Sequence, residues 1–396
     1  MINIFLLFLI SSTLYCQTYK HNINQFINTQ KRISVSERIV EFDIGYKFEE
    51  KILFETDEKN LYYTYNNIIN CKLDFIKYNY ANKLSDTISI NIPEVGKLNC
   101  VNSDKQIDDY YISNDTLFVK YRYSIFIYKI ESTVTKLVKS IYLDQIIRRG
   151  SNDNRVGYKF QKYNNKIIGY LDIYIEHSLV NNNLFIWSYD FENNKLDTIS
   201  IPQPVGYRWT QIQAKNIVDY KFGKLVTCDL EQDNLYLINS KDSIEKIKLG
   251  IFKNNWTIEN QLEINHPQEF FNLNHKILDS MYLIHSVNFL DKDNILVKYS
   301  IPKTFETDLF SIFNFCILSK INNKWIIKNP VNPELIFGDN RIEDKRIYGY
   351  YYLVSHGKLI SKHFSSFYDR NEKSFIRVEN TQDVLDRIKS SVKYLK

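Results

Sequence analysis

The sequence predicts an all-β chain folded as a single β-propeller, with six four-stranded blades and a short C-terminal helix. Two observations lead to this prediction: a composition rich in strand-forming residues, and a β-hairpin that recurs along the chain. The 396 residues include 30 Tyr and 25 Phe but only two Met. Aromatic residues fit the half-buried surface of a sheet, and closed β architectures often exceed the length of an average domain while remaining one unit.

The N-terminus carries a short apolar run, Ile4–Ile10, which reads IFLLFLI. This run is too short to span a membrane as a helix, and it is typical of a signal peptide. Small Cys16 suits the position before cleavage, which predicts a mature chain that starts at Gln17. Two alternatives are lipid attachment at Cys16, which bulky Tyr15 disfavours, and an N-terminal strand or helix buried in the fold.

These observations divide the chain into a signal peptide over 1–16, a propeller over 17–380 and an amphipathic helix or tail over 381–396. We expect the protein to be exported to the periplasm, the cell surface or the medium. No other run of about 18 apolar residues is present, so we expect no transmembrane segment.

Two segments show the repeat most clearly. Lys77–Gly96 reads KYNYANKLSDTISINIPEVG, and Ser188–Gly206 reads SYDFENNKLDTISIPQPVG. Each predicts a strand, an Asn-rich turn and a second strand that ends near a Pro and a Gly. Looser copies are Tyr128–Leu143, Leu235–Leu249 and Cys316–Lys328. Most of these hairpins recur roughly every 50 residues, the spacing of propeller blades.

Further strand candidates precede the hairpins, for example Ile107–Ile112 and Thr116–Tyr121, which gives four strands per unit. Three strands in the tail supply a sixth unit: Tyr348–Ser355, Leu359–Phe364 and Phe375–Val378. The early segments Arg38–Asp43 and Ile52–Glu55 have no hairpin of their own. We expect one of them to pair into the last blade and close the ring.

The last residues of the chain show a different pattern. Val384, Leu385, Ile388, Val392 and Leu395 recur at helical spacing with charged residues between them. This spacing predicts a short amphipathic helix that packs on the propeller.

The predicted export, the LYCQ stretch at Leu14–Gln17 and the six loose blades resemble secreted or periplasmic Bacteroidetes propellers of the TolB-like and NHL-like kind. Several families of unknown function belong to that group. The resemblance implies one propeller over nearly the whole mature chain, and it implies no particular activity.

Several functional classes find no support in the sequence. The net charge is +5 and is spread along the chain, so we expect no nucleic-acid partner. The motifs of nucleotide-binding loops, dinucleotide-binding folds, serine hydrolases and zinc proteases are missing, and we expect no cofactor. Asp291–Asn294 resembles the start of a calcium loop, but a hairpin turn explains it better. The spacing of His266, Glu269 and His275 does not establish a metal site.

Four cysteines remain after the predicted cleavage: Cys71, Cys100, Cys228 and Cys316. Export permits disulfides, but four cysteines allow three pairings and the sequence does not choose among them. Buried free thiols are an equal alternative for Cys228 and Cys316.

An Asp followed by Ser or Thr and then an aliphatic residue occurs five times, beginning at Asp86, Asp115, Asp197, Asp242 and Asp279. This pattern resembles an O-glycan acceptor site of exported Bacteroidetes proteins. The simpler interpretation is that Asp ends a turn and the next two residues begin a strand.

The candidate binding residues lie in the predicted connectors between blades, which all reach one face of a propeller. The connectors, drawn at 93–105, 144–157, 202–211, 250–275 and 329–345, include six of the seven prolines. Rigid loops that carry arginine and aromatic residues suit recognition. The predicted ligand-binding residues are Arg148, Arg149, Tyr207, Arg208, Trp209, Trp256 and Arg341.

The sequence therefore predicts a monomeric, non-catalytic binding or scaffold protein whose partner is a protein, a peptide or an anionic glycan. The alternative is a carbohydrate-active hydrolase or lyase, which would need a carboxylate pair at the propeller centre. Acidic residues in the connectors are candidates for such a pair. They are Asp153, Asp339, Glu343 and Asp344.

Overall fold

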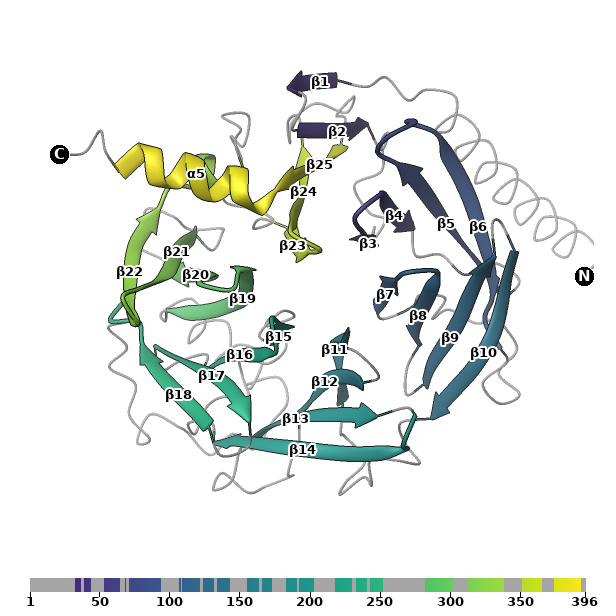
Figure 1. Ribbon diagram of the computed structural model, residues 1–396, viewed down its shortest axis with the longest axis horizontal. Coiled ribbons are helices and arrows are strands. Elements are labelled where there is room, and N and C mark those ends of the chain that lie inside the picture. Colours follow the sequence, from purple (N-terminus) through teal and green to yellow (C-terminus); the bar gives the residue numbers. More distant parts are fainter. Residues whose placement is uncertain are drawn as a thin grey trace, which may run out of the picture.

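The computed structural model describes residues 33–36, 39–43, 53–64, 68, 71–93, 107, 109–121, 124–131, 134–142, 155–163, 166–172, 183–190, 192–202, 218–229, 233–240, 243–251, 282–301, 312–337, 351–364 and 374–392. Within these segments the chain forms six antiparallel sheets and two helices. The sheets stand around a common centre, each with one strand innermost (Figure 1). This arrangement of four-stranded sheets is a β-propeller.

Five of the sheets have four strands each, in sequential order from the centre to the rim. The first three contain β3 (Leu53–Thr56), β4 (Asn60–Thr64), β5 (Lys72–Asn79), β6 (Ser85–Asn91), β7 (Asp109–Ser113), β8 (Thr116–Tyr121), β9 (Ser124–Glu131), β10 (Val134–Tyr142), β11 (Arg155–Tyr163), β12 (Lys166–Asp172), β13 (Asn183–Asp190) and β14 (Lys195–Pro202). The next two contain β15 (Val218–Lys221), β16 (Lys224–Asp229), β17 (Asn234–Ser240), β18 (Ser243–Lys248), β19 (Leu283–Asp291), β20 (Asn294–Ile301), β21 (Ile312–Ile321) and β22 (Lys324–Val331).

The remaining sheet joins the two ends of the chain. It contains β23 (Tyr351–Ser355), β24 (Lys358–Phe364) and β25 (Ser374–Asn380), followed by β2 (Ile39–Asp43) and β1 (Ile33–Ser36). The pairing of β2 with β25 confirms that Arg38–Asp43 is the early segment that completes the last sheet. The other candidate, Ile52–Glu55, overlaps β3, the inner strand of the next sheet. An early strand in this place covers a sheet edge that would otherwise be open.

The six inner strands contact one another in a closed order: β3, β7, β11, β15, β19, β23 and again β3. The core lies between neighbouring sheets. For example, Phe75 of β5 packs edge-to-face on Tyr110 of β7, with 4.8 Å between ring centroids. Val226 of β16 and Val287 of β19 are both fully buried in one apolar cluster. Burial between sheets therefore holds the ring together.

The predicted hairpins are confirmed, since Leu137, Leu196, Ile244 and Trp325 lie in outer strands and Leu84 directly precedes one. The predicted connectors, however, include residues that belong to strands or to a helix. Arg155 begins β11, Pro202 ends β14, Pro330 lies in β22, and Pro333 begins the short helix α4 (Pro333–Phe337). Outer strands tolerate proline because their free edge needs no N–H donor.

Helix α5 (Thr381–Val392) packs its apolar face on the last sheet and on α4. Val384, Leu385 and Ile388 are buried in one cluster with Ile336 and Phe337. The backbone N–H of Thr381 and its hydroxyl both donate to the carbonyl of Gly357, at 2.9 and 3.1 Å. The helix start is thereby fixed to the β23–β24 turn.

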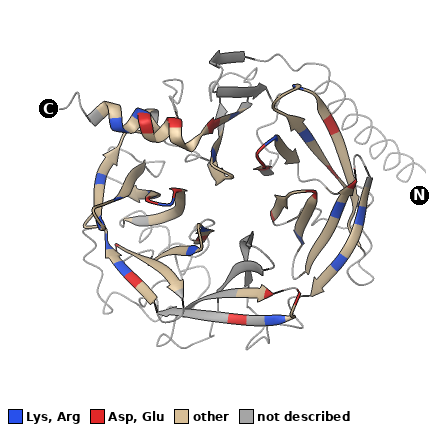
Figure 2. Cartoon of the chain, in the orientation of Figure 1, with Lys and Arg blue, Asp and Glu red and all other residues tan. Residues whose placement is uncertain are grey.

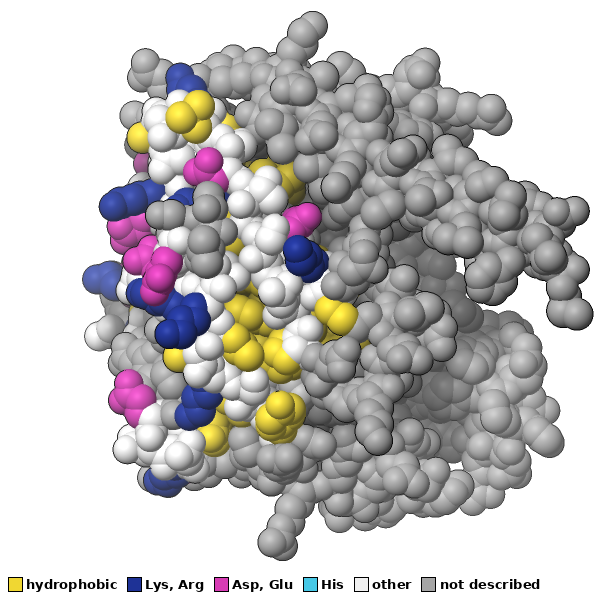
Figure 3. Space-filling view, turned by 90° about the vertical axis from the view of Figure 1, so that its right-hand side faces the viewer, with side chains coloured by type: hydrophobic (Ala, Val, Ile, Leu, Met, Phe, Trp, Pro, Cys, Tyr) yellow, Lys and Arg dark blue, Asp and Glu magenta, His cyan; other side chains and the backbone are white. Residues whose placement is uncertain are grey.

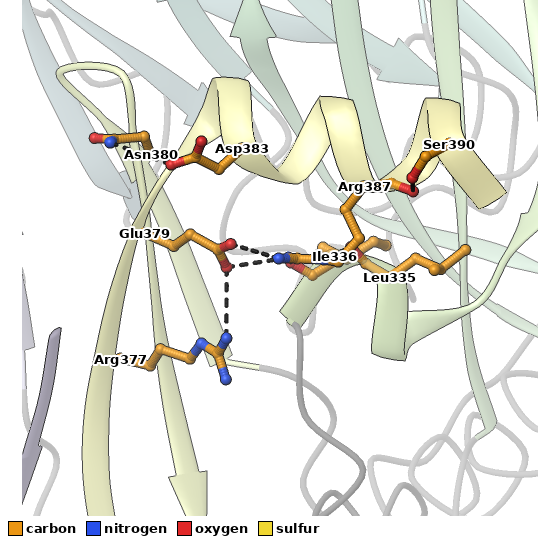
Figure 4. A network of polar contacts seen from close by, with 8 residues as sticks. All are labelled: Leu335, Ile336, Arg377, Glu379, Asn380, Asp383, Arg387 and Ser390. Atoms are coloured by element: carbon orange, nitrogen blue, oxygen red, sulfur yellow. Dashed lines mark hydrogen bonds and ion pairs between the residues drawn. The ribbon is translucent and has the colours of Figure 1, made fainter. Parts of the chain in front are cut away.

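A buried ionic network fixes the middle of α5 (Figure 4). Arg387 pairs through two nitrogens with the carboxylate of Glu379. It also donates to the carbonyls of Leu335 and Ile336 at 2.7 and 2.9 Å. On the other side of Glu379, Arg377 lies 3.8 Å away. One arginine therefore joins α5 to both α4 and β25.

The described cysteines are in two states. Cys71 is disulfide-bonded, whereas Cys228 and Cys316 are buried free thiols. The other two cysteines, Cys16 and Cys100, lie outside the described residues. Among the Asp-Ser/Thr triplets, Ile88 and Leu117 are buried as strand residues, but Ile244 is 45% exposed.

Charged residues of both signs are spread around the ring and along its outer strands (Figure 2). The side of the ring formed by β6 and β10 combines apolar and charged side chains (Figure 3). On β10, Leu137 and Val138 are 40% and 63% exposed, and Val138 lies where the pairing with β9 shifts register. None of the helices in the described segments has the length and apolarity needed to cross a membrane.

Candidate functional site

The ring has two ends with different loops. At one end, here called the connector face, the chain passes from the outer strand of one sheet to the inner strand of the next. At the other end, the hairpin face, tight turns join each inner strand to the second strand. The described residues place a group of polar side chains near the centre at each end.

The residues predicted to bind the ligand all fall outside the described segments, and so do the acidic candidates for catalysis. They remain predictions. The first set is Arg148, Arg149, Tyr207, Arg208, Trp209, Trp256 and Arg341; the second is Asp153, Asp339, Glu343 and Asp344.

The polar group toward the connector face comes from β19, β20 and β21, with one residue from the neighbouring β23. We call it the connector-face cluster. It lies toward the beginning of β19, the end of β20 and the beginning of β21, and β19 is the inner strand of its sheet. Its members are His285, Ser286, Lys298, Ser300, Phe313 and Tyr352.

A β-bulge aims His285 into this cluster. Ile284 pairs with Tyr299 and Ser286 pairs with Lys298, so His285 is an extra residue on β19. Bulges redirect side chains and are frequent next to active sites. The imidazole Nε2 of His285 lies 2.9 Å from the hydroxyl of Ser300, which orients both groups.

The Lys298 side chain lies over an aromatic ring. Its ammonium nitrogen is 4.2 Å from the centroid of Phe313, a distance at which the negative face of the ring attracts a cation. His285 meets the same ring edge-to-face, with centroids 5.0 Å apart. Phe313 therefore holds the lysine and the histidine together.

One hydroxyl group, that of Tyr352, joins the cluster from the neighbouring sheet. Ser286, which pairs with Lys298 across the two strands, has its Oγ 2.7 Å from the hydroxyl of Tyr352 on β23. Both residues are buried. The cluster thus bridges two sheets next to the centre of the ring.

Burial changes the charge states of these groups. It lowers the pKa of Lys298 to about 7, and burial together with the nearby Lys298 lowers the pKa of His285 to about 3. By solvent exposure both residues are of intermediate burial. Burial also raises the pKa of Tyr352 well above its ordinary value. Strongly shifted pKa values of this kind gather at functional sites.

The polar group at the hairpin face is tied into the ring. Lys221 at the end of β15 is 2.9 Å from buried Asp219 and donates to the carbonyls of Phe289 on β19 and Val354 on β23, at 3.4 and 2.7 Å. Asp219 also accepts the backbone N–H of Phe289 at 2.8 Å. One lysine therefore reaches past a neighbouring sheet to the next.

Two turns at this face carry unusual residues. Phe222 and His356 have positive φ angles of 56° and 46°, and each precedes a glycine that also has positive φ. Such turns match the twist of a hairpin but favour Asn or Gly at the first position. His356 stacks on Tyr111 of β7 with centroids 6.2 Å apart, while Phe222 is 54% exposed.

No sequence pattern predicted the connector-face cluster. The available signal was a single lysine in the apolar strand NILVKYSI, at Asn294–Ile301, since lysine is seldom placed in a core. Asp291–Asn294, in contrast, forms the predicted hairpin turn between β19 and β20. Within the described segments, no group of three or more His, Cys, Asp or Glu side chains is arranged to hold a metal.

No family model and no curated protein matches the chain. Among solved structures, a member of the DUF4221 family from Bacteroides vulgatus is similar, with 10% identity, a TM-score of 0.50 and coverage of 88% of this chain and 98% of that chain. The β-propeller domain of the Trilobed protease from Pyrococcus furiosus matches with 8% identity, a TM-score of 0.42 and coverage of 88% and 96%. A Trypanosoma rangeli sialidase matches with 9% identity, a TM-score of 0.46 and coverage of 89% and 58%.

At such low identities the likeness concerns the fold alone. The β-propeller follows from the sheet arrangement, and the likeness does not single out the TolB-like or NHL-like kinds.

Proposed function

We propose that this chain is an exported six-bladed β-propeller that binds a carboxylated sugar on its connector face without transforming it. The observation that carries the proposal is the connector-face cluster, where a half-buried lysine lies beside an imidazole and several hydroxyl groups. Binding sites are often built in this way, with a few polar groups converging in a largely apolar setting.

Six blades and export are part of the proposal. The six sheets of the described residues and the closed order of their inner strands support the blade number. The apolar run Ile4–Ile10 supports export, and the disulfide at Cys71 suits an oxidising compartment. The intact mass of the secreted protein tests the mature N-terminus at Gln17. An acyl group on a chain that starts at Cys16 would contradict it.

The chemistry of the cluster favours an acidic sugar. Lys298 can pair with a carboxylate, and a charge-assisted hydrogen bond of this kind is stronger than a neutral one. The hydroxyls of Ser300, Ser286 and Tyr352 can exchange hydrogen bonds with sugar hydroxyls. The described residues of the cluster include no carboxylate pair, which glycoside hydrolysis generally requires, so we propose binding and not hydrolysis.

A pair of matched ligands tests this function. D-Glucuronate and D-glucose differ by a carboxylate, and ligand-observed NMR can compare their binding to the purified full-length mature protein. We expect glucuronate to bind and Lys298→Met to weaken it at least about tenfold, the loss of one charged hydrogen bond. Lys324→Met, on exposed β22 of the same sheet, is the control. Equal binding of both sugars, or unchanged binding by Lys298→Met, would overturn the proposal.

The predicted arginines of the connectors supply a second test. If they share this face, Arg149→Ala and Arg208→Ala should weaken capture of a longer acidic glycan while the melting temperature stays nearly unchanged, because exposed charges contribute little to folding. Binding that survives both changes would remove these two residues from the site but leave the role of Lys298 standing. An acidic peptide that competes with glucuronate would shift the ligand class to protein.

A further inference from the structure

Arg387 of the helix α5 holds the short helix α4 in a definite place (Figure 4). Its guanidinium donates to the carbonyls of Leu335 and Ile336 at 2.7 and 2.9 Å, and it also pairs with the buried carboxylate of Glu379. The two carbonyls lie in the last turn of α4, where a helix offers them no partners of its own. One side chain therefore sets the position of α4 relative to β25.

The last residue of α4, Phe337, connects this position to the connector-face cluster. Its buried ring lies 5.9 Å from the ring of Tyr352 and 5.4 Å from that of Phe315, and these two rings are 6.1 Å apart. Aromatic rings at such distances attract one another in particular relative orientations. Tyr352 in turn places its hydroxyl 2.7 Å from Ser286 Oγ. The direction of the Tyr352 hydroxyl thus depends on where Phe337 lies.

We propose that Arg387 is a positioning residue for the connector-face cluster. It fixes α4, so that Phe337 holds the Tyr352 hydroxyl in the orientation that a ligand of the cluster requires. This inference rests on the proposed binding of a carboxylated sugar. It gives α5, which is not itself part of the cluster, a role in that binding.

Attachment of α5 to the ring would not by itself need this arginine. Val384, Leu385 and Ile388 already bury an apolar face in one cluster with α4, and a buried ion pair is often no more stabilising than apolar residues of similar volume. A guanidinium differs from apolar contacts because its planar set of donors fixes the direction of its acceptors. Binding groups need such support, since they must be held within about 0.5 Å of the productive geometry.

A double-mutant cycle in the full-length mature protein tests the proposal. Tyr352→Phe removes the hydroxyl and keeps the ring, and ligand-observed NMR measures the affinity for D-glucuronate. We expect Arg387→Met and Tyr352→Phe each to weaken binding about fivefold, the loss of one neutral hydrogen bond. In the Tyr352→Phe protein, Arg387→Met should have no further effect, because it acts through that hydroxyl. The same weakening by Arg387→Met in both backgrounds would overturn the proposal.

Thr381→Ala is the control for a general loss of helix stability. It removes a hydroxyl hydrogen bond at the start of α5 but leaves the contacts of Arg387 in place, so the affinity should stay within about twofold of wild type. Equal weakening by Thr381→Ala and Arg387→Met would mean that any loosening of α5 lowers the affinity, which would contradict a specific role of Arg387.

The same measurements separate this inference from the proposed function. A wild-type protein that does not bind glucuronate would overturn the proposed function and the inference with it. Wild-type binding that Arg387→Met leaves unchanged would overturn the inference alone.

Discussion

Lys221 and Lys298 approach the centre of the ring from its two ends, and their neighbours differ in kind. Lys221 is held by the carboxylate of Asp219 and by two backbone carbonyls of neighbouring sheets. Lys298 lies over the ring of Phe313, beside neutral His285. The first environment satisfies a charge within the fold, whereas the second leaves its lysine with a lowered pKa.

This difference separates a structural contact from a functional one. A lysine whose charge is balanced by a buried carboxylate ties β15 to the two sheets beyond it and gains from remaining charged. A lysine whose charge is poorly solvated costs stability, and proteins keep such costs mainly where a ligand or a reaction uses them. The hairpin-face contacts therefore tie neighbouring sheets together, whereas ligand binding at the connector face remains our proposal.

The largest expected effect comes from breaking the hairpin-face contact. Asp219→Ala removes the partner of Lys221 and the acceptor for the N–H of Phe289, both in a fully buried place. Removing one partner of a buried ion pair typically costs about 3–5 kcal/mol, which urea unfolding would measure. Asp197→Ala is the matched control. Asp197 pairs with exposed Lys195 at 3.7 Å, and its loss should cost under about 1 kcal/mol.

If both substitutions lower the free energy of unfolding by the same amount, the contact between Lys221 and the neighbouring sheets does not hold the ring closed.

The corresponding change at the connector face should act in the opposite direction. With a folded pKa of about 7 for Lys298, the unfolded chain binds more protons between pH 7 and about 10.4. Wild-type stability therefore rises with pH in this window and carries the full cost below pH 7. Lys298→Met should stabilise the fold by about 2 kcal/mol at pH 6, and the gain should shrink toward pH 10.

Denaturant unfolding at pH 6, 8 and 10 would reveal this trend, with Lys324→Met as the control. A gain that is the same at all three pH values would exclude the lowered pKa of Lys298 as its cause.

His285 should determine how the stability of the same region changes at acidic pH. Its folded pKa of about 3 lies below the ordinary value of 6.5, so the unfolded chain binds more protons between these limits. Wild-type stability is complete above pH 6.5 and falls as the pH decreases through this window. His285→Gln should make the loss between pH 6 and 4 smaller by about 1–2 kcal/mol, as measured by thermal unfolding.

At the hairpin face, burial also lowers the pKa of His356. His356→Gln should nevertheless change this acid slope less, because His356 is an exposed residue whose charge water screens. An equal change in the two variants would contradict the difference between the faces.

The sequence predicted the fold better than the site, for a physical reason. Strand pairs joined by short turns are local, so hairpins such as Ser188–Gly206 appear in the sequence itself. The pairing of Ile39–Asp43 with β25 was predictable because an isolated strand needs a neighbour. The expectation that prolines lie in the connectors was wrong for Pro202 and Pro330. Proline is excluded from central strands, but it is tolerated in edge strands such as β14 and β22.

The connector-face cluster depends on features that no local pattern encodes. His285 enters it because one extra residue shifts the register between β19 and β20. Tyr352 joins it from another sheet, brought close by the closure of the ring. A lone lysine in an apolar strand was the one sequence signal, and its aromatic neighbour became evident only through strand pairing.

The smallest expected effect concerns Phe222, in the turn between β15 and β16 at the hairpin face. Phe222 begins a tight turn with a φ of 56°, an uncommon angle for a bulky residue. Its ring meets Phe289 edge-to-face at 6.0 Å, a contact that contributes about 0.5–1.5 kcal/mol. Asn is preferred at this position before Gly223, and relief of the backbone strain offsets about 1–2 kcal/mol.

Phe222→Asn should therefore leave the free energy of unfolding, measured by urea unfolding, within about 1 kcal/mol of wild type. A clear loss of stability would mean that Phe222 is a structural part of the hairpin face, like Asp219. The expected small change would mean that the contacts of Lys221 and Asp219, and not the Phe222 turn, tie the sheets together at this face.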